Sequence, residues 1–296
     1  MADLPSDLVV AGVAPRADEA AAAKLGGRWR GSLGVIVPAV MVAFIFGLCF
    51  IWPLIGPVPS PTGGTILDSN LAAFSSGHFL GTDAVGNDEW ARLLYGGRAS
   101  LEIALAVQAI GLVLGGLIGA VAAYLGGLRD ATIMRLLDVV IAFPGLVLAV
   151  AIAQGLGPSK LHTIWALCFF SVPATARIAR AATMRVREQT FMVAARLSGT
   201  SFPRMLLGHI APNVVPQLLT YALLGMGIIM ILEGALSFVG LGVPPPAPSW
   251  GNMIAQGQST LSAQPRYVFL PSAALFITVV SLNLLGEGLR SRWGAQ

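Results

Sequence analysis

Long apolar runs separated by short polar segments dominate the pattern of this 296-residue chain. Six runs approach the roughly 20 residues that a helix needs to cross a bilayer. They lie at about 31–51, 100–124, 133–156, 161–179, 214–236 and 268–285. None alternates as a barrel strand does, and only helices or closed barrels satisfy their backbone in lipid. The pattern predicts an all-α, polytopic membrane protein with six transmembrane helices.

Composition supports lipid as the main solvent. Charged residues make up 11% of the chain and hydrophobic residues 55%, whereas soluble domains carry roughly 25% charged residues. A net charge of +4 would suggest nucleic acid in a soluble protein. Here the basic residues flank the spans, where they set topology, and we expect no nucleic-acid partner. Cys49 and Cys168 both lie in apolar runs, so no disulfide framework is expected.

The distribution of Lys and Arg predicts the orientation. With a cytoplasmic N-terminus, 14 of the 18 basic residues fall inside, and four fall outside: Arg92, Arg98, Lys160 and Arg266. Inner segments of membrane proteins carry the excess of basic residues. We expect a multi-pass protein of the cell inner (plasma) membrane with both termini in the cytoplasm. Residues 1–30 are then a mobile cytoplasmic tail, 31–290 the transmembrane domain and 291–296 the cytoplasmic C-terminus.

The segment at about 187–212 is a basic loop between two spans, with a helical stripe at i, i+3, i+4 and i+7: Phe191, Ala194, Ala195 and Ser198. Gly199 stands where a C-terminal cap is expected. Thr200 or Ser201 can cap a second helix, with Pro203 in its first turn, and Pro212 is expected to end it. Small residues on an exposed stripe would let another protein approach the backbone closely. The alternative is an amphipathic loop on the membrane surface.

Two long outer segments, 54–99 and 241–267, are rich in proline. Dense proline disfavours regular helix and favours a stiff extended surface, suited to a docking partner or a simple connector. Acidic and amide residues in the first segment do not follow the calcium-loop register. They are expected to cap a short outer helix that runs through Tyr95: Asp83, Asn87, Asp88 and Glu89.

Ionisable residues within spans are costly and usually face the bundle interior. Glu102 and Glu233 are therefore candidates either for a polar lining of a translocation path or for structural hydrogen bonds. For Asp138 and Glu287 we favour a structural bond, to Arg135 or a neighbouring helix in the case of Asp138. Glycines at four-residue spacing predict a close-packing face toward another span: Gly111, Gly115 and Gly119.

Motifs for chemistry are absent from the sequence. It contains no Gly-x-x-x-x-Gly-Lys-Ser/Thr phosphate loop. His78, His162 and His209 are scattered, with no metal-ligand spacing. No catalytic residue, metal site or cofactor of this chain is expected.

Several distinctive stretches occur in order along the chain: Gly81-Thr82-Asp83, Arg92 to Arg98, Met134 to Asp138, Ala142-Phe143-Pro144, His209-Ile210 with Pro212-Asn213, Leu236 to Gly242 and Pro248 to Gly251. Together they resemble permeases of ABC importers of the dipeptide/oligopeptide/nickel type, specifically the C-type subunit. The resemblance implies the type I importer permease fold. It also implies a loop that couples to an ATPase: Val193, Ala194, Ala195, Gly199 and Pro212. Val193 departs from the family pattern, which has an acidic residue there.

The resemblance further implies a homologous second permease, two cytoplasmic ATPases that bind ATP and Mg, and an external substrate-binding protein. The chain would then move substrate by alternating access and would not itself be an enzyme. Di- and oligopeptides are the expected cargo, with glutathione, nickel complexes and haem left open. A secondary transporter driven by an ion gradient is the rival interpretation. It predicts inverted repeats, which the two halves do not show, and it leaves the basic loop unexplained.

Overall fold

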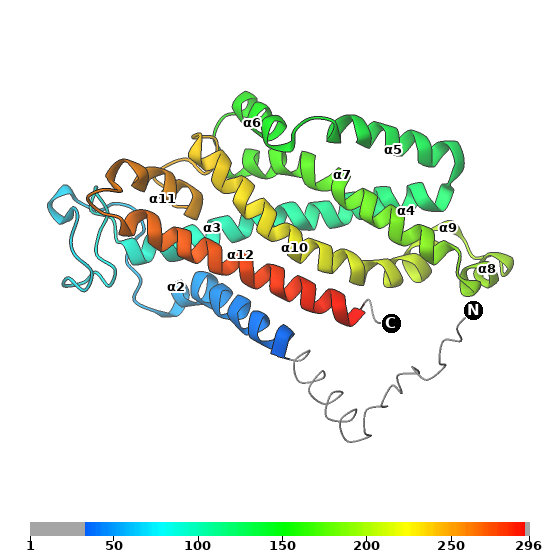
Figure 1. Cartoon of the computed structure of the whole chain (residues 1–296), viewed down its shortest axis with the longest axis horizontal. Helices are drawn as coiled ribbons and strands as arrows, with labels where there is room; N and C mark the ends of the chain where they lie inside the picture. The colour runs from blue at the N-terminus through cyan, green and yellow to red at the C-terminus, as the bar shows by residue number, and fades with distance from the viewer. Residues whose placement is uncertain (1–32, 294–296) are drawn as a thin grey trace, which may run out of the picture.

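The computed structural model describes residues 33–293, and the regular secondary structure of this part is helical (Figure 1). Within this part, five helices are long and apolar enough to cross a membrane: Leu33–Ile55, Glu89–Leu125, Lys160–Arg187, Phe202–Phe238 and Arg266–Arg292. A bent pair of helices gives a sixth span if it is counted as one. The all-α polytopic fold is confirmed. The tail predicted at 1–30 and the last three residues lie outside the described residues.

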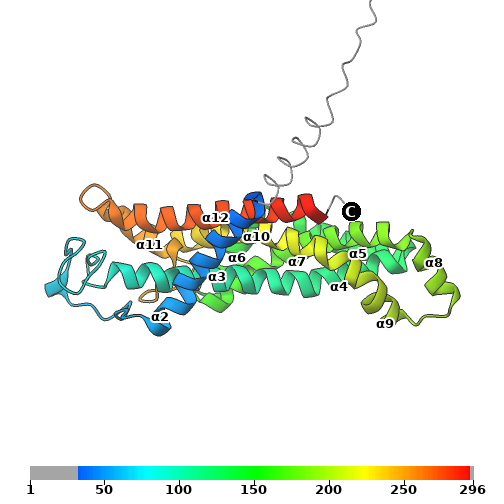
Figure 2. The same cartoon turned by 90° about the horizontal axis from the view of Figure 1, so that it is seen from below.

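The spans are assembled from consecutive helical pieces. The first ends in a π-helical turn, Gly47–Ile51, and α2, Trp52–Ile55. The second joins α3, Glu89–Ile110, to α4, Gly116–Leu125, through a π-helical turn at Gly111–Gly115. The others are α7 (Lys160–Arg187), α10 (Ala211–Phe238) and α12 (Arg266–Trp293). Short helices α8 (Thr190–Leu197), α9 (Phe202–Arg204) and α11 (Trp250–Gly257) lie at the two ends of the bundle (Figure 2).

The third span, predicted at 133–156, is a bent pair of helices and not one continuous helix. The chain forms α5, Gly127–Ile141, and α6, Gly145–Leu156, which are bent by 78° at the break between them. Pro144 lies in this break with φ −58° and ψ 118°, outside the helical region. Proline donates no backbone hydrogen bond and disfavours helical geometry in the residue before it. The sequence therefore stays apolar across Pro144, although the helix is interrupted there.

The second span is longer than predicted. The side chain of Asp88 accepts the backbone N–H of Ala91 and so caps α3 as expected. The helix that it caps is no short outer element, because it runs on through the span to Leu125. Arg92 and Arg98, expected in an outer loop, lie within it.

The glycine stripe confirms close packing inside the chain. A Cβ at Gly115 would lie 2.5 Å from the Val172 carbonyl oxygen of α7, and one at Gly111 would lie 2.6 Å from Ser171 Oγ. A Cβ at Gly119 would collide with the Ala176 carbonyl. The absence of side chains lets α4 and α7 approach backbone to backbone.

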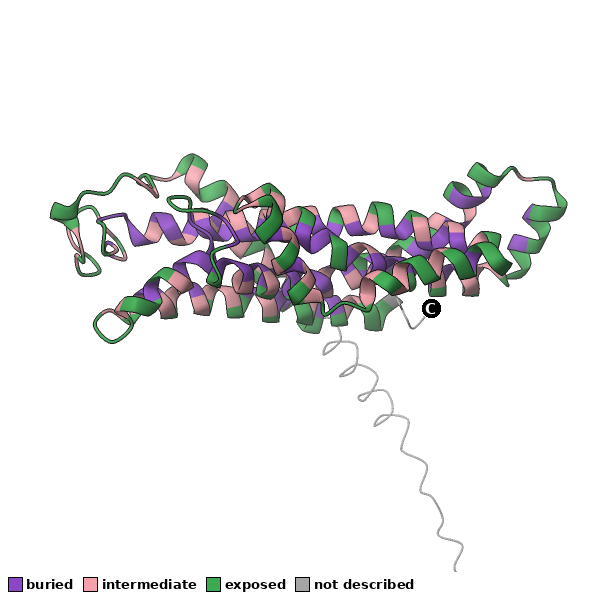
Figure 3. Cartoon of the chain, turned by 90° about the horizontal axis from the view of Figure 1, so that it is seen from above, coloured by how far each residue is buried: buried purple, intermediate pink, exposed green. Residues whose placement is uncertain are grey.

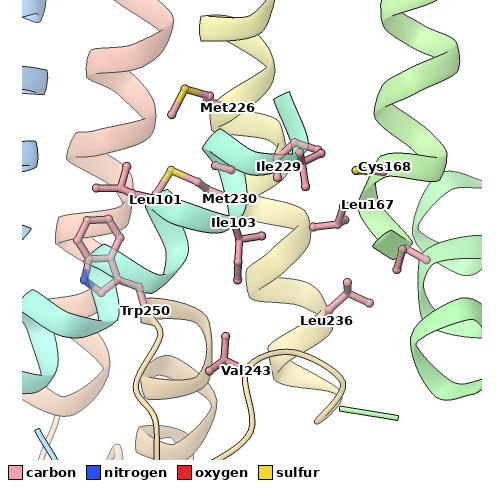
Figure 4. Close-up of a cluster of buried hydrophobic side chains, with 14 of the residues drawn as sticks. Leu101, Ile103, Leu167, Cys168, Met226, Ile229, Met230, Leu236, Val243 and Trp250 are labelled. Atoms are coloured by element: carbon pink, nitrogen blue, oxygen red, sulfur yellow. The ribbon is translucent and has the colours of Figure 1, made fainter. Parts of the chain in front are cut away.

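The main apolar core lies where α3, α7, α10 and α11 meet. Figure 4 shows Leu101 and Ile103 of α3 against Ile229 and Met230 of α10, with Trp250 at the edge of the cluster. Buried residues follow the interior of the bundle, and the outer surfaces of the helices are exposed (Figure 3). Large apolar side chains such as Phe276 and Val113 are about two-thirds exposed on these surfaces. This distribution is typical of helices that face lipid.

Pro212 does not end a helix, contrary to the prediction. Helix α9 continues through a π-helical segment, Met205–Ile210, directly into α10. The N–H of Ala211 donates to the Leu206 carbonyl five residues earlier. Pro212 has no N–H to donate, and the side-chain amide of Asn213 instead donates to the His209 carbonyl at 2.7 Å. The π-helical turn and this side-chain bond carry the helix past the proline.

The outer segment 241–267 contains a helix that its proline content did not predict. The prolines end at Pro248, and Ser249 begins α11 with a reciprocal capping box. Its Oγ accepts the N–H of Asn252, whose side-chain oxygen accepts the N–H of Ser249. The polar residues after the proline cluster thus start a helix locally.

Candidate functional site

The segment that contains α8 lies beyond the end of the spans, on the side opposite α11 (Figures 1 and 2). Met192 and Ala195 are buried at 0% and 8% exposure. They pack with Met205, Leu206 and Ile210 of the next segment. One face of α8 is therefore used to hold the helix against its own chain.

The opposite face of α8 is apolar and exposed. Val193 is 48% exposed and Leu197 85%, and Phe191 and Ala194 are exposed beside them. The expectation of small residues on the exposed stripe is wrong for two reasons. Ala195 faces inward, and the exposed side chains include three large ones. A contiguous exposed apolar face of this kind is typical of a protein-binding surface.

The turn after α8 takes the form expected at Gly199. Gly199 has a φ of +70°, and its N–H donates to the Arg196 carbonyl at 3.0 Å. The N–H of Thr200 donates to the Ala195 carbonyl at 3.1 Å. These two bonds form the Schellman ending of a helix. Ser201 precedes α9 as predicted, with Pro203 in its first turn, but its side chain makes no capping bond.

The start of α8 lacks an acidic residue. Its first turn holds none, and Gln189 occupies the capping position without a side-chain bond. Val193 lies on the exposed face, where an acidic residue would meet solvent or a partner. Arg196 Nη2 donates to the Arg187 carbonyl at 2.9 Å and so links α8 to the end of α7.

Glu233 is buried at the centre of a hydrogen-bond network in the half of the bundle that carries α11. It is 0% exposed, and its carboxylate accepts hydroxyl hydrogen bonds from three segments. The donors are Ser100 of α3 at 3.0 Å, Ser237 of α10 at 2.8 Å and the cap residue Ser249 at 2.9 Å. This geometry supports the structural alternative for Glu233, since its oxygens are engaged within the chain.

The three other acidic residues singled out in the sequence, Glu102, Asp138 and Glu287, form ion pairs. Glu102 is about one-third exposed and contacts Arg98 Nε at 2.9 Å and also Lys160 of α7. Asp138 pairs with Arg177 Nη2 at 2.5 Å, so the neighbouring helix, and not Arg135, supplies its partner. Glu287 lies 3.5 Å from Arg290 on an exposed surface.

A polar hollow lies beside the first half of α10, and its residues were not predicted as a site from the sequence. It encloses about 650 Å³ and is lined by residues of α7, α10 and α12, including Arg185, Gln217, Tyr221 and Arg290. Neither Glu102 nor Glu233 lines it. The α10 residues Asn213, Gln217, Thr220 and Tyr221 recur at i, i+4, i+7 and i+8, a polar face on an apolar span. That periodicity was the available signal.

The residues described by the structure contain no group of three or more His, Cys, Asp or Glu side chains that could hold a metal ion. The arrangement consists of an exposed apolar helix at one end, a polar hollow between spans, and acids held in internal pairs. An exposed apolar helix suits the docking of another protein, and a polar hollow between spans suits the passage of a polar solute.

Comparison with known proteins identifies the family. The profile described as "Binding-protein-dependent transport system inner membrane component" matches residues 111–292. The chain is 38% identical to the glutathione transport system permease protein GsiD of Pectobacterium atrosepticum, covering 73% of this chain and 72% of that protein. It is 37% identical to the probable D,D-dipeptide transport system permease protein DdpC of Escherichia coli, covering 76% and 75%.

A putative peptide transport system permease protein of Brucella suis is 40% identical, over 72% of each chain. Among solved structures, a chain of the MetNI methionine ABC transporter, described as inward-facing, aligns with a TM-score of 0.55 at 16% identity. That alignment covers 67% of this chain and 95% of the other, and it confirms the importer permease fold. The chain thus belongs to the family of binding-protein-dependent transport system inner membrane components, as a multi-pass ABC transporter permease that works with ATPase and binding-protein partners.

Proposed function

We propose that this chain is one of two homologous permease subunits of an ATP-driven importer for short peptides and peptide-like molecules. The relatives named for glutathione, D,D-dipeptide and peptide transport support this cargo class. Two cytoplasmic ATPases would bind ATP and Mg and supply the energy. This chain would then need no catalytic residue or cofactor of its own.

The observation that carries the proposal is the exposed apolar face of α8. Leu197 is 85% exposed at the end of the molecule opposite the outer loops. We propose that Val193, Ala194 and Leu197 enter a groove of an ATPase, while Ala195 and Gly199 fix the shape of the segment. Movement of the ATPases would then pass from α8 through the turn at Gly199 to α9, which continues into α10 through the π-helical segment without a break.

The domain layout and orientation form part of the same proposal. Residues 31–290 make up the transmembrane domain, with 1–30 and 291–296 in the cytoplasm and the coupling loop at about 187–212. Single cysteines at Ser76 and Ser262, both exposed at the outer end, should react with an impermeant reagent on intact cells. A cysteine at Ser201 should react only after permeabilisation. Labelling of Ser201→Cys on intact cells would reverse the orientation.

We further propose that the polar hollow contributes to the translocation path. Arg185 and Arg290 supply positive charge that suits the carboxylates of peptides, and Gln217 and Tyr221 supply hydrogen-bonding groups. Glu102 and Glu233 then act mainly in structure. Arg185→Gln should lower the rate of peptide uptake while leaving basal ATP hydrolysis unchanged.

The coupling role is tested with Leu197→Asp in the reconstituted transporter. Burying a charge in an apolar groove costs more than about 1.4 kcal/mol, so ATPase association should weaken at least about tenfold. Peptide uptake should fall in parallel. Leu128→Asp is the matched control, because Leu128 is 87% exposed and belongs to α5 and not to α8.

Two results would contradict the proposal. Normal ATPase association and uptake in Leu197→Asp would remove α8 as the coupling element. Uptake by the chain without ATPases, driven by a proton gradient, would favour the secondary transporter.

A further inference from the structure

A second cavity lies at the outer end of the molecule, far from α8. It encloses about 470 Å³ between the loop before α3, the start of α3, and α11 with the turn that follows it. Its walls include Glu89, Arg92, Pro245, Pro246 and Met253. Its rim carries Ser259, which is exposed.

Glu89 borders this cavity in an unusual state. The residue is 2% exposed, and its carboxylate makes no hydrogen bond or ion pair with another described residue, although the positive charges of Arg92 and Arg266 act on it from a greater distance. Its neighbours are engaged elsewhere. Asp88 contacts His78 Nδ1 at 2.8 Å and caps α3, and Arg92 Nη2 donates to Gln256 Oε1 at 2.9 Å.

Arg92 could have paired with Glu89 from one turn along the helix. Its Nε instead lies 3.4 Å from Asp83 Oδ2, on the other side. Glu89 is the first residue of α3, so its carboxylate interacts favourably with the positive end of the helix dipole. A buried carboxylate without a donor nevertheless costs more than a neutral group left unpaired, which costs about 1–3 kcal/mol. Among the described residues no side chain donates to this carboxylate, and a cation that entered the cavity would pair with it.

The lining of the cavity indicates what kind of cation fits. No cluster of three metal-ligating side chains exists among the described residues, which disfavours a metal ion. Met253, Pro245 and Pro246 give apolar walls above the carboxylate. Lysine and arginine combine an apolar stem with a charged head, so their shape and polarity match such a pocket.

We propose that this pocket receives a lysine or arginine side chain of the external binding protein, which pairs with Glu89. The proposal rests on the proposed function, which supplies that partner. The pocket opens between the outer loops, on the surface where an external protein would dock. Glu89 then fixes the position of the binding protein over the permease, and its charge steers docking.

A reporter cysteine at Ser259 tests the pocket directly. Native Cys49 and Cys168 are buried, so background labelling should be low. In the assembled transporter, the labelling rates of Ser259→Cys with cationic and anionic methanethiosulfonate reagents are compared. Removal of the nearby charge by Glu89→Gln should lower the cationic-to-anionic ratio about fivefold. Asp68→Asn removes an exposed charge from the same outer surface and should leave the ratio unchanged.

Two further measurements keep the test independent of any folding defect. With Glu89 intact, the ratio at Ser259→Cys should exceed the ratio at Ser262→Cys, an exposed position that does not line the pocket. Glu89→Asp keeps the charge and should retain most of the preference. Equal ratios at the two reporter sites, or no change in Glu89→Gln, would overturn the proposal.

The partner is identified by protection of the reporter. Added binding protein should slow labelling of Ser259→Cys, and Glu89→Gln should weaken its affinity about tenfold, mainly at low salt. Protection by a dipeptide without the binding protein would assign the pocket to the ammonium group of the substrate and would overturn the proposal. Charge preference needs no ATPase, so a failure of ATPase coupling in α8 would leave this result readable.

Discussion

The two ends of this permease are held in different ways; under the proposed orientation, the end with α11 is the outer end and the end with α8 the inner end. At the outer end, hydrogen bonds join segments that lie far apart in the sequence. Tyr267 donates to the Thr82 carbonyl at 2.7 Å, and Trp250 Nε1 donates to the Leu93 carbonyl at 2.8 Å. At the inner end, α8 is attached through buried Met192 and Ala195 and through the bond from Arg196 to the end of α7.

We therefore expect the outer end to be rigid by itself and the inner end to need a partner protein that covers its exposed apolar face. Most polar groups of the outer network pair with one another, so its geometry is determined mainly by the chain itself, and Glu89 beside the outer cavity is an exception. The inner segment leaves Phe191, Val193 and Leu197 exposed, an arrangement that water does not favour. Substitutions at the outer end should therefore change stability, and substitutions in α8 should change coupling.

Glu233→Ala should give the largest loss of stability. It leaves the hydroxyls of Ser100, Ser237 and Ser249 without their acceptor in a buried place. Each buried polar group without a partner costs about 1–3 kcal/mol, and we expect a total of about 2–4 kcal/mol after relaxation. Thermal unfolding of the purified protein in detergent measures the effect. Glu233→Gln keeps the shape and one acceptor and should lose less. If Glu233→Ala had the same melting temperature as the unmodified protein, the outer network would not be the rigid part of the molecule.

The membrane helices could largely be predicted from the sequence, because runs without charge have few alternatives to helix in lipid. Two features escaped for physical reasons. Hydropathy does not register a bend, so the break at Pro144 was hidden inside an apolar run. Hydropathy also excludes polar residues from a predicted span. Arg92 nevertheless lies in α3, because its side chain contacts Asp83 and Gln256 within the protein.

For the segment around α8, the sequence predicted the turn at Gly199 but not which face of the helix is buried. The positive φ of Gly199 follows from local chemistry, since glycine at a helix end favours it. The inward face of α8 does not, because periodicity gives two faces and the tertiary partners, Met205 and Ile210, decide which is buried. In the same way, no sequence spacing brings Ser100 and Ser249 to Glu233. Only the folded chain places them together.

Gly199→Val should have a smaller effect, confined to the inner end. A β-branched residue at φ +70° costs about 1–2 kcal/mol. No atom lies within 4 Å of an added Cβ, so the cost is conformational and not a collision. We expect an unchanged melting temperature and reduced peptide uptake, because the turn between α8 and α9 is disturbed locally. Gly199→Asn is the matched control, since asparagine tolerates this region. If valine and asparagine gave equal uptake, the turn would not matter for coupling.

Arg196→Gln should have the smallest effect and should sharpen the comparison most. The bond from Arg196 to the Arg187 carbonyl is exposed, and a cation at a helix C-terminus contributes about 0.3–1 kcal/mol. Global stability should not change measurably, because the spans do not depend on α8. Amide hydrogen exchange in α8 should nevertheless become faster, since local opening depends on the few contacts that attach the segment. Arg196→Lys keeps the charge and should exchange at an intermediate rate. Faster exchange throughout α10 as well would mean that α8 is part of one cooperative unit with the span, and the contrast between the two ends would then be lost.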